Sequence, residues 1–69
     1  MSLKGFKLLT KLRASNIRQR RALDGFLEQH GIEYRNRDHW QADVMEYFVR
    51  PADLCCAQAV LGAVQELGE

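Results

Sequence analysis

Segments with the two-residue period of a β-strand alternate in this chain with segments of helical period, and their order restricts the fold. Residues 6–12 alternate between the two faces of a strand, and residues 15–31 then follow a helical spacing. Residues 32–37 alternate again, residues 44–49 form the most β-prone run, and residues 50–68 return to helical spacing. The sequence therefore predicts the order β-α-β-β-α.

Short connections and a right-handed crossover arrange these elements as a three-stranded antiparallel sheet in the order 1-3-2, with both helices on one face. This is an α+β fold, ferredoxin-like but lacking the last strand. A chain of 69 residues has room for a single α+β domain, which we expect to span residues 1–69. The outer edge of the first strand is then unpaired, and the sheet face away from the helices is uncovered.

The first helix has recognisable ends. Ser15 and Asn16 offer side-chain oxygens for its N-cap, and Gly31 suits the left-handed residue that closes a helix. The face predicted to be buried holds Gln19, Leu23, Phe26, Leu27 and His30. The face predicted to lie in solvent holds Arg18, Arg21, Asp24 and Glu28. We expect the arginines of this helix, Arg18, Arg20 and Arg21, to be solvated and not to bind phosphates, since the two acids lie close enough to pair with them.

The last helix begins near a proline. Pro51 fits a first helical turn, Asp53 complements the helix dipole, and Gly68 ends the helix. The predicted buried stripe consists of Leu54, Ala57, Val60, Leu61, Val64 and Leu67.

Alternation also predicts which strand residues face the helices. The core side is expected to hold Phe6, Leu8, Leu12, Ile32 and Tyr34. The open side is expected to hold Lys7, Leu9, Lys11, Glu33, Arg35 and Arg37. The third strand leaves two alternatives, of which we favour burial of Met45, Tyr47 and Val49. That choice leaves Glu46 in solvent near the arginines and Phe48 on the open face.

The open face is the candidate interaction face, with Lys7, Lys11, Arg35, Arg37 and Phe48, and Trp40 in a nearby polar turn. Basic residues around a sheet aromatic can bind single-stranded nucleic acid, although one aromatic is few for such a site. The alternative is a solvated or subunit-contacting face. Trp40 is either a lid over the end of the core or a contact for a partner.

Charge is unevenly distributed along the chain. Residues 1–37 hold nine basic side chains and three acids, whereas residues 38–69 hold one basic side chain and six acids. Such asymmetry favours an anionic partner, although folding can also interleave the two halves, and we expect that cancellation.

We expect no metal site, no cofactor and no enzymatic activity. His30, His39, Cys55 and Cys56 are the only soft-metal candidates, and their spacing is unlike that of structural zinc ligands. His30 completes an apolar stripe, and the two cysteines are expected to behave as small core hydrophobes. The sequence contains no recognisable catalytic triad, phosphate loop or close carboxylate pair.

The short chain has no covalent staple, because its two cysteines are adjacent. We therefore expect a homodimer, formed through the first strand or the open sheet face. Reduced thiols and the absence of a long apolar run or a signal-peptide pattern predict a cytoplasmic protein without membrane contact.

Two segments resemble a known family. FLEQHGI at residues 26–32 and VRPADLCCAQAVL at residues 49–61 are similar to a family of very short bacterial signal-transducing proteins of unknown function, with a PII-like, ferredoxin-like half fold. The resemblance covers nearly the whole chain. It implies the fold, but its motifs form a cap, a core and a turn, so no binding residue carries over. Cys55 and Cys56 depart from it, since alanine or arginine is common there.

These observations predict a small non-catalytic regulatory or protein-interaction module that recognises another protein or a small molecule. The first alternative is a nucleic-acid-binding module that uses the basic open face. The second is a thiol or metal sensor, which requires an exposed cysteine beside a histidine or a positive charge.

Overall fold

The structure is a computed structural model and describes residues 3–66, except for the side chain of Trp40. The elements along the chain are β1 (Lys7–Arg13), α1 (Ile17–Gln29), β2 (Tyr34–His39), the 3-10 turn η1 (Trp40–Ala42), β3 (Val44–Val49), the 3-10 turn η2 (Pro51–Asp53) and α2 (Leu54–Gln65). The predicted order β-α-β-β-α is confirmed.

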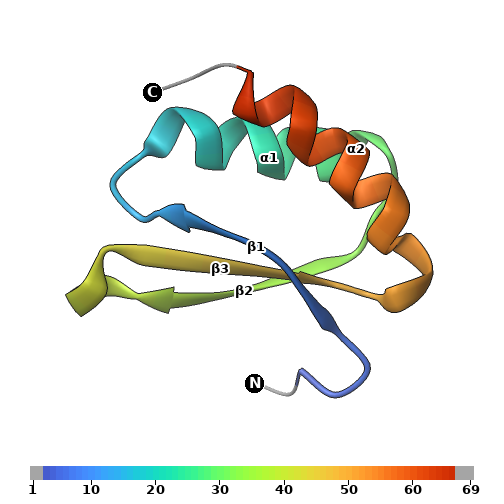
Figure 1. The fold of residues 1–69 in the computed structure, drawn as a ribbon, viewed down its shortest axis with the longest axis horizontal. Coiled ribbons are helices and arrows are strands. Elements are labelled where there is room, and N and C mark those ends of the chain that lie inside the picture. The colour runs from blue at the N-terminus through green and yellow to red at the C-terminus, as the bar shows by residue number, and fades with distance from the viewer. Residues whose placement is uncertain (1–2, 67–69) are drawn as a thin grey trace.

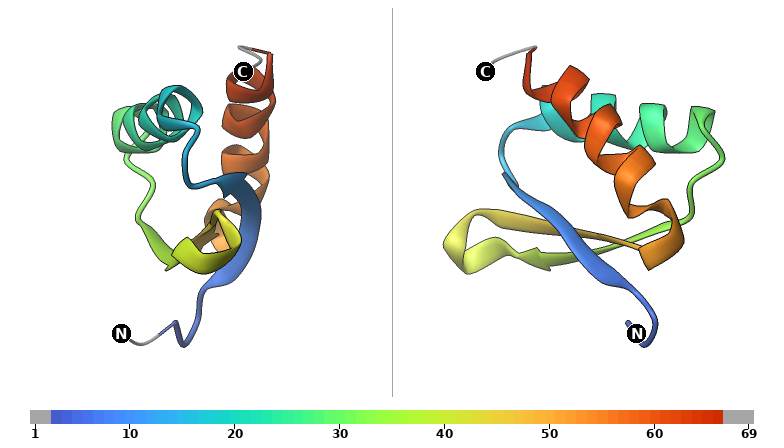
Figure 2. Two further views of the ribbon diagram at one scale, coloured as in Figure 1. Left: turned by 90° about the vertical axis from the view of Figure 1, so that its left-hand side faces the viewer. Right: turned by 45° about the vertical axis from the view of Figure 1, so that its right-hand side comes forward.

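The sheet and the helices form two layers (Figure 1). The strands are ordered β1-β3-β2, and both edge strands run antiparallel to the central β3. Both helices cover one face of the sheet and leave the other face open (Figure 2). The predicted α+β fold, ferredoxin-like without its last strand, is therefore confirmed. Within residues 3–66 no helix is long and apolar enough to cross a membrane.

Specific hydrogen bonds and a glycine fix both ends of α1. The side chain of Asn16 caps the helix by accepting a hydrogen bond from the Gln19 backbone N–H. Ser15 instead donates its backbone N–H and its hydroxyl to the Asp43 carboxylate, both at 2.9 Å, which ties the start of α1 to the turn before β3. Gly31 has a φ of 68° and closes the helix as predicted.

One hydrophobic core lies between the sheet and the helices. Its buried members are Leu12, Leu23, Leu27, Ile32, Met45, Tyr47, Val49, Ala57, Val60 and Val64. The favoured choice for the third strand is confirmed, because Met45, Tyr47 and Val49 all face this core. The predicted stripe of α2 is buried at its centre and half-buried at Leu54 and Leu61. Leu67 and Gly68 lie outside the described residues.

The prediction for the faces of β1 is wrong before Thr10. The pairing of β1 with β3 shifts between Leu8 and Thr10, so one extra residue, Leu9, is inserted as a β-bulge. Thr10 lies opposite the core residue Tyr47, and Leu9 packs against the core. Leu8, predicted to be buried, is 45% exposed.

The bulge also separates the two lysines of β1. Lys11 pairs with Glu46 on the open side, whereas Lys7 pairs with Val49, whose side chain is in the core. Paired residues share a face, so Lys7 lies on the helix side of the sheet edge and not on the open face. A one-residue insertion reverses every preceding side chain, which is why alternation from Leu12 backwards failed.

The remaining boundary errors concern β2 and α2. β2 begins at Tyr34 and not at residue 32, and it extends beyond the predicted end at residue 37 to Asp38 and His39, because both pair with β3. α2 begins only at Leu54, since η2 with Pro51 at its start forms the first turn instead. Asp53 makes no side-chain capping hydrogen bond.

Candidate functional site

The sheet face away from the helices, here called the open sheet face, gathers most of the polar contacts between strands. Strand pairing and side-chain contacts assign to it Phe6, Leu8, Lys11, Arg13, Glu33, Arg35, Arg37, His39, Glu46, Phe48 and Arg50. It thus carries five lysine or arginine side chains and two glutamates, a net charge of +3 with His39 neutral. The acidic half of the chain cancels only part of the positive charge here.

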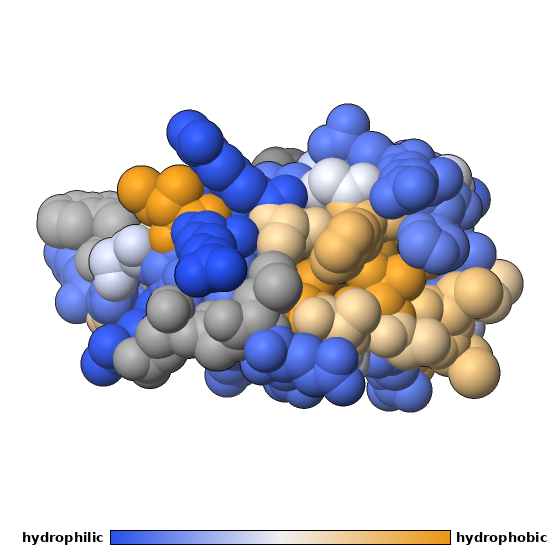
Figure 3. Space-filling view, turned by 90° about the horizontal axis from the view of Figure 1, so that it is seen from above, coloured by the Kyte–Doolittle hydropathy of each residue, from blue (hydrophilic) through white to orange (hydrophobic). Residues whose placement is uncertain are grey.

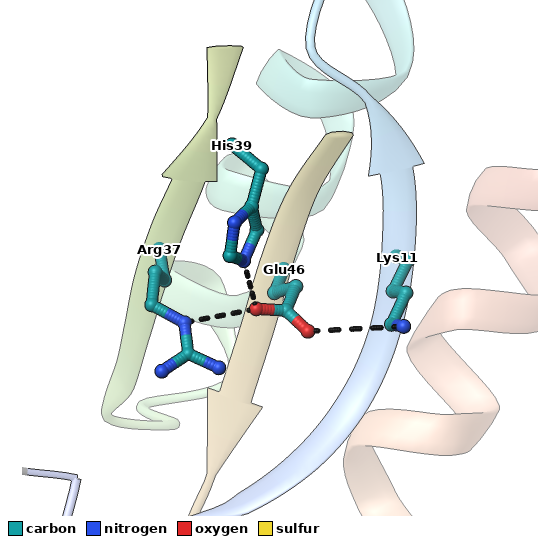
Figure 4. Close-up of polar contacts among 4 residues, drawn as sticks. All are labelled: Lys11, Arg37, His39 and Glu46. Carbon is teal, nitrogen blue, oxygen red and sulfur yellow. Dashed lines mark hydrogen bonds and ion pairs between the residues drawn. The ribbon is translucent and has the colours of Figure 1, made fainter. Parts of the chain in front are cut away.

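Glu46 is the centre of an ion-pair cluster formed by all three strands (Figure 4). Arg37 donates from Nε to its Oε1 at 2.9 Å, His39 donates from Nε2 to the same oxygen, and Lys11 Nζ lies 3.9 Å from Oε2. Glu46 was predicted to lie in solvent but is only 8% exposed, because the long side chains on both neighbouring strands cover it. The hydrogen bonds from His39 and then Arg37 lower the pKa of Glu46 below its ordinary value.

A second cluster surrounds Phe6 at the other end of the sheet. The guanidinium carbons of Arg35 and Arg50 lie 5.0 and 5.6 Å from its ring centroid, within the range of a cation–π contact. Both arginines also bond to Glu33, with Nη2–carboxylate distances of 2.8 Å for Arg35 and 2.6 Å for Arg50. The hydrogen bond from Arg35 lowers the pKa of Glu33, and Arg50 acts in the same direction.

Phe48 lies between these two clusters. The Arg37 guanidinium is 5.4 Å from its ring centroid, and the residue is only 8% exposed although it lies on the open side. The Arg37 side chain itself is 54% exposed, so it covers the ring from the solvent side. Leu8 is exposed and pairs with Phe48 across the strands, so these two residues form an apolar strip between the two clusters.

The structure brings together four of the predicted interaction residues, Lys11, Arg35, Arg37 and Phe48. Lys7 is not among them, and the side chain of Trp40 lies outside the described part of the chain. Sequence reasoning missed Phe6, whose position depends on the bulge. It also missed His39 and Arg50. Arg50 could have been found, because residues 44, 46 and 48 lie on the open side and the next position of this alternation is residue 50.

The helix layer carries a different surface. A shallow groove of about 340 Å³ runs between α1 and α2 and is called here the helix groove; it is lined by Phe26, Gln29, His30, Cys56, Ala59, Val60 and Ala63. Hydrophobic residues gather over this part of the helix layer (Figure 3). His30 was predicted to be buried but is exposed, because its Nδ1 donates to the Phe26 carbonyl at the end of the helix, at 2.8 Å.

The outer side of α2 lacks charged residues. None occurs from Leu54 to Gln65, and the exposed positions are Cys55, Cys56, Gln58, Ala59, Gly62, Ala63 and Gln65. Both cysteines were expected in the core and are exposed free thiols instead. Their exposure follows from the helical period, since Ala57, Val60 and Val64 define the opposite, buried side.

A polar contact inside the molecule joins α1 to β3. The hydroxyl of the fully buried Tyr47 donates to Asp24 Oδ1 at 2.9 Å, so Asp24 is not on a purely solvated face as predicted. Arg20 differs from the expected solvated arginines too, because it is half-buried and donates from Nη1 to the Ala14 carbonyl at 2.7 Å. Arg18 and Arg21 are exposed.

Two further findings bear on function. Among residues 3–66 there is no group of three or more histidine, cysteine, aspartate or glutamate side chains that could hold a metal ion. No family model, curated protein or solved structure matches this chain.

Proposed function

We propose that this chain is a small, non-catalytic interaction module that forms a homodimer through the exposed side of α2 and the helix groove. The observation that carries the proposal is the absence of charge along α2, at positions that are open to solvent. A surface helix normally carries charged residues on its solvent side, whereas the exposed side of α2 carries only two glutamines, Gln58 and Gln65, among small residues. The helix groove adds the larger apolar side chain of the half-buried Phe26 to the same surface.

Electrostatics favours a second copy of the chain as the occupant. In a two-fold dimer each patch meets an identical patch, so a charged patch repels itself and an uncharged one does not. The open sheet face has a net charge of +3, and β1 carries exposed lysines and a bulge, which are features that discourage edge pairing. This choice of the helix layer differs from the sequence-based expectation of self-association through the first strand or the open sheet face.

The glycine of α2, Gly62, adds support, and Gly25 of α1 serves as its comparison. Gly25 and Gly62 each lie inside a helix at an exposed position, where an added Cβ would meet no atom within 4 Å. Such a glycine costs about 0.5–1 kcal/mol relative to alanine and serves no packing purpose within one copy. On α2, Gly62 lies near Cys55 and Ala59, and these small side chains allow a second helix to approach closely.

A pair of charge insertions tests the dimer. Ala59→Lys places a charge in the middle of α2, whereas Ala42→Lys adds the same charge to an exposed alanine of η1. Light scattering coupled to size-exclusion chromatography should give a dimer mass for the parent and for the Ala42 variant, and a monomer mass for the Ala59 variant. A parent that stays monomeric at high concentration, or equal dimerisation of both variants, refutes the proposal.

The glycines provide a second test, in which one substitution should stabilise the monomer and weaken the dimer. Both Gly25→Ala and Gly62→Ala should raise the stability of the folded monomer by about 0.5–1 kcal/mol, because alanine lowers the entropy of the unfolded chain. Only Gly62→Ala should weaken the dimer, since Gly25 lies among the charged residues of the outer side of α1. Equal dimer affinity in the two variants would show that Gly62 is not at the interface.

The remaining assignments are part of the same proposal. A cytoplasmic location is supported by the two exposed free thiols, which persist in a reducing compartment. A regulatory role that recognises a protein or small molecule follows from the resemblance to the signal-transducing family, and it stays a prediction. A thiol sensor requires Cys56 to be exposed near a histidine; Cys56 is exposed and lines the helix groove together with His30.

A further inference from the structure

The open sheet face combines two aromatic rings with an excess of cations, on the side of the molecule opposite α1 and α2. Phe6 and Phe48 are the rings, and Arg35, Arg37 and Arg50 are the cations that lie over them. Lys11 adds a fourth cation to the same face, where it lies 3.9 Å from Glu46. We propose that this face binds single-stranded nucleic acid, with the rings stacking on bases and the cations contacting phosphates. This binding is independent of the proposed dimer, because it uses the other face of the molecule.

The sequence predicted only one aromatic residue, Phe48, on the open face, which is few for a site that binds single-stranded nucleic acid. The structure adds a second aromatic residue, Phe6. Alternation placed Phe6 in the core, but the bulge at Leu9 turns it to the open side. Phe6 precedes by two residues Leu8, which pairs with Phe48, so the alternation of the strand brings the two rings to the same side of the sheet. Two adjacent bases of an extended strand can stack on rings arranged in this way.

The arginines show how a base could reach the rings. Each ring has a planar guanidinium over it, and guanidinium planes occupy the position that a stacked base would take. Arg37 and Arg50 have side chains that are 54% and 56% exposed, so they can swing outward without disturbing the core. A guanidinium that moves from a ring to a phosphate uncovers the ring and forms a stronger, charge-assisted hydrogen bond.

The two glutamates compete with the phosphates of a nucleic acid for the same cations. Glu46 holds Lys11 and Arg37, and Glu33 holds Arg35 and Arg50. A phosphate must displace these carboxylates, so neutralising Glu46 should tighten binding. A purely structural role for the cluster gives no reason for such a gain.

Single strands are favoured over a duplex. A duplex conceals the faces of its bases, so the rings of this sheet could not stack on them, and only the phosphates would be contacted. The preference for a single strand over a duplex of the same sequence therefore measures the contribution of Phe6 and Phe48. An acidic polypeptide offers charge without bases and serves as the third ligand.

Fluorescence anisotropy with labelled oligouridylate and oligothymidylate tests the proposal, with duplex DNA and polyglutamate as comparison ligands. With four phosphate contacts, the logarithm of affinity should fall with the logarithm of salt concentration with a slope of about −3. Single strands should bind more tightly than the duplex and polyglutamate. Absence of binding at low salt, or equal affinity for all ligands, overturns the proposal.

Four variants resolve the contributions, each checked for folding by circular dichroism. Phe6→Leu should weaken single-strand binding about tenfold and leave duplex binding unchanged. Arg37→Gln should reduce the salt slope by about 0.7, whereas Arg21→Gln, the same change of charge on the outer side of α1, should not. Glu46→Gln should tighten binding several-fold. An Arg21 effect as large as that of Arg37, or weaker binding by a folded Glu46 variant, contradicts the assigned surface.

Discussion

Removing one buried hydroxyl should destabilise this protein measurably. Tyr47 is fully buried at the centre of β3, and its hydroxyl donates to Asp24 Oδ1 at 2.9 Å. In the variant Tyr47→Phe the ring still fills the core, but the half-buried Asp24 carboxylate loses a partner. A hydrogen bond to a charged group contributes about 1.5–3 kcal/mol, and because Asp24 retains partial access to water we expect a loss of about 1.5–2 kcal/mol.

That loss is large for so short a chain. A domain of this length has a free energy of unfolding of roughly 3–10 kcal/mol, so the variant should lose a substantial part of it. The midpoint of thermal unfolding should fall by roughly 6–16 °C. Urea denaturation followed by circular dichroism gives the free energy, with an unchanged m-value as evidence that only stability has changed.

Tyr34→Phe is the matched control. The two rings are 6.0 Å apart, but the Tyr34 hydroxyl lies 3.4 Å from Glu28 Oε2 at the exposed side of the molecule. This long contact should contribute less than about 0.5 kcal/mol. Equal losses in the two variants, or a loss below 0.5 kcal/mol for Tyr47→Phe, would refute the argument that burial and bond length set the magnitude.

The same hydroxyl predicts an alkaline transition. Burial, and then the hydrogen bond to Asp24, raise the pKa of Tyr47 well above its ordinary value of 10.0. The unfolded chain therefore ionises first, so stability is complete below about pH 10 and declines as the pH rises through the folded-state pKa. The Tyr47→Phe variant should lose less stability than the parent over this range, as measured by urea denaturation at increasing pH.

Three further outcomes follow. The ion pairs lower the pKa values of Glu33 and Glu46 below the ordinary value of 4.5, so they stabilise the fold at pH values above 4.5. The free energy of unfolding should therefore decline as the pH falls below 4.5, and a flat profile down to strongly acidic pH would contradict the ion pairs. Leu23→Ala, at a fully buried position of α1, should lower the free energy of unfolding by about 2–5 kcal/mol in urea denaturation, and a neutral result would mean that the cavity collapses. At protein concentrations low enough to give the monomer, Cys55 and Cys56 should both react with a thiol reagent as fast as in urea, and the proposed dimer should slow both reactions; equal rates in monomer and dimer would place the thiols outside the interface.

The elements and their order could be read from the sequence because they depend on local chemistry. The helical spacing of Leu23 and Leu27, the Asn16 cap and the left-handed Gly31 each act within a few residues, and all three are present in the structure. The run from residue 44 to 49 was recognised as a strand in the same way, and its buried side was chosen correctly. The period of α2 also indicates that Cys55 and Cys56 are exposed, but the hydrophobicity of cysteine led to the wrong prediction that both lie in the core.

What the sequence alone did not determine depends on pairing between distant segments. The bulge at Leu9 arises where β1 is matched to β3, and it moves Phe6 and Leu8 to the open sheet face and Lys7 away from it. The burial of Glu46 likewise depends on Lys11 and on β2, which contribute covering side chains from different parts of the chain. The sequence therefore determined the elements and the fold, because local periods and caps specify them. The tertiary structure decided which residues share the candidate site, because a one-residue shift in pairing reverses the face of every side chain before it.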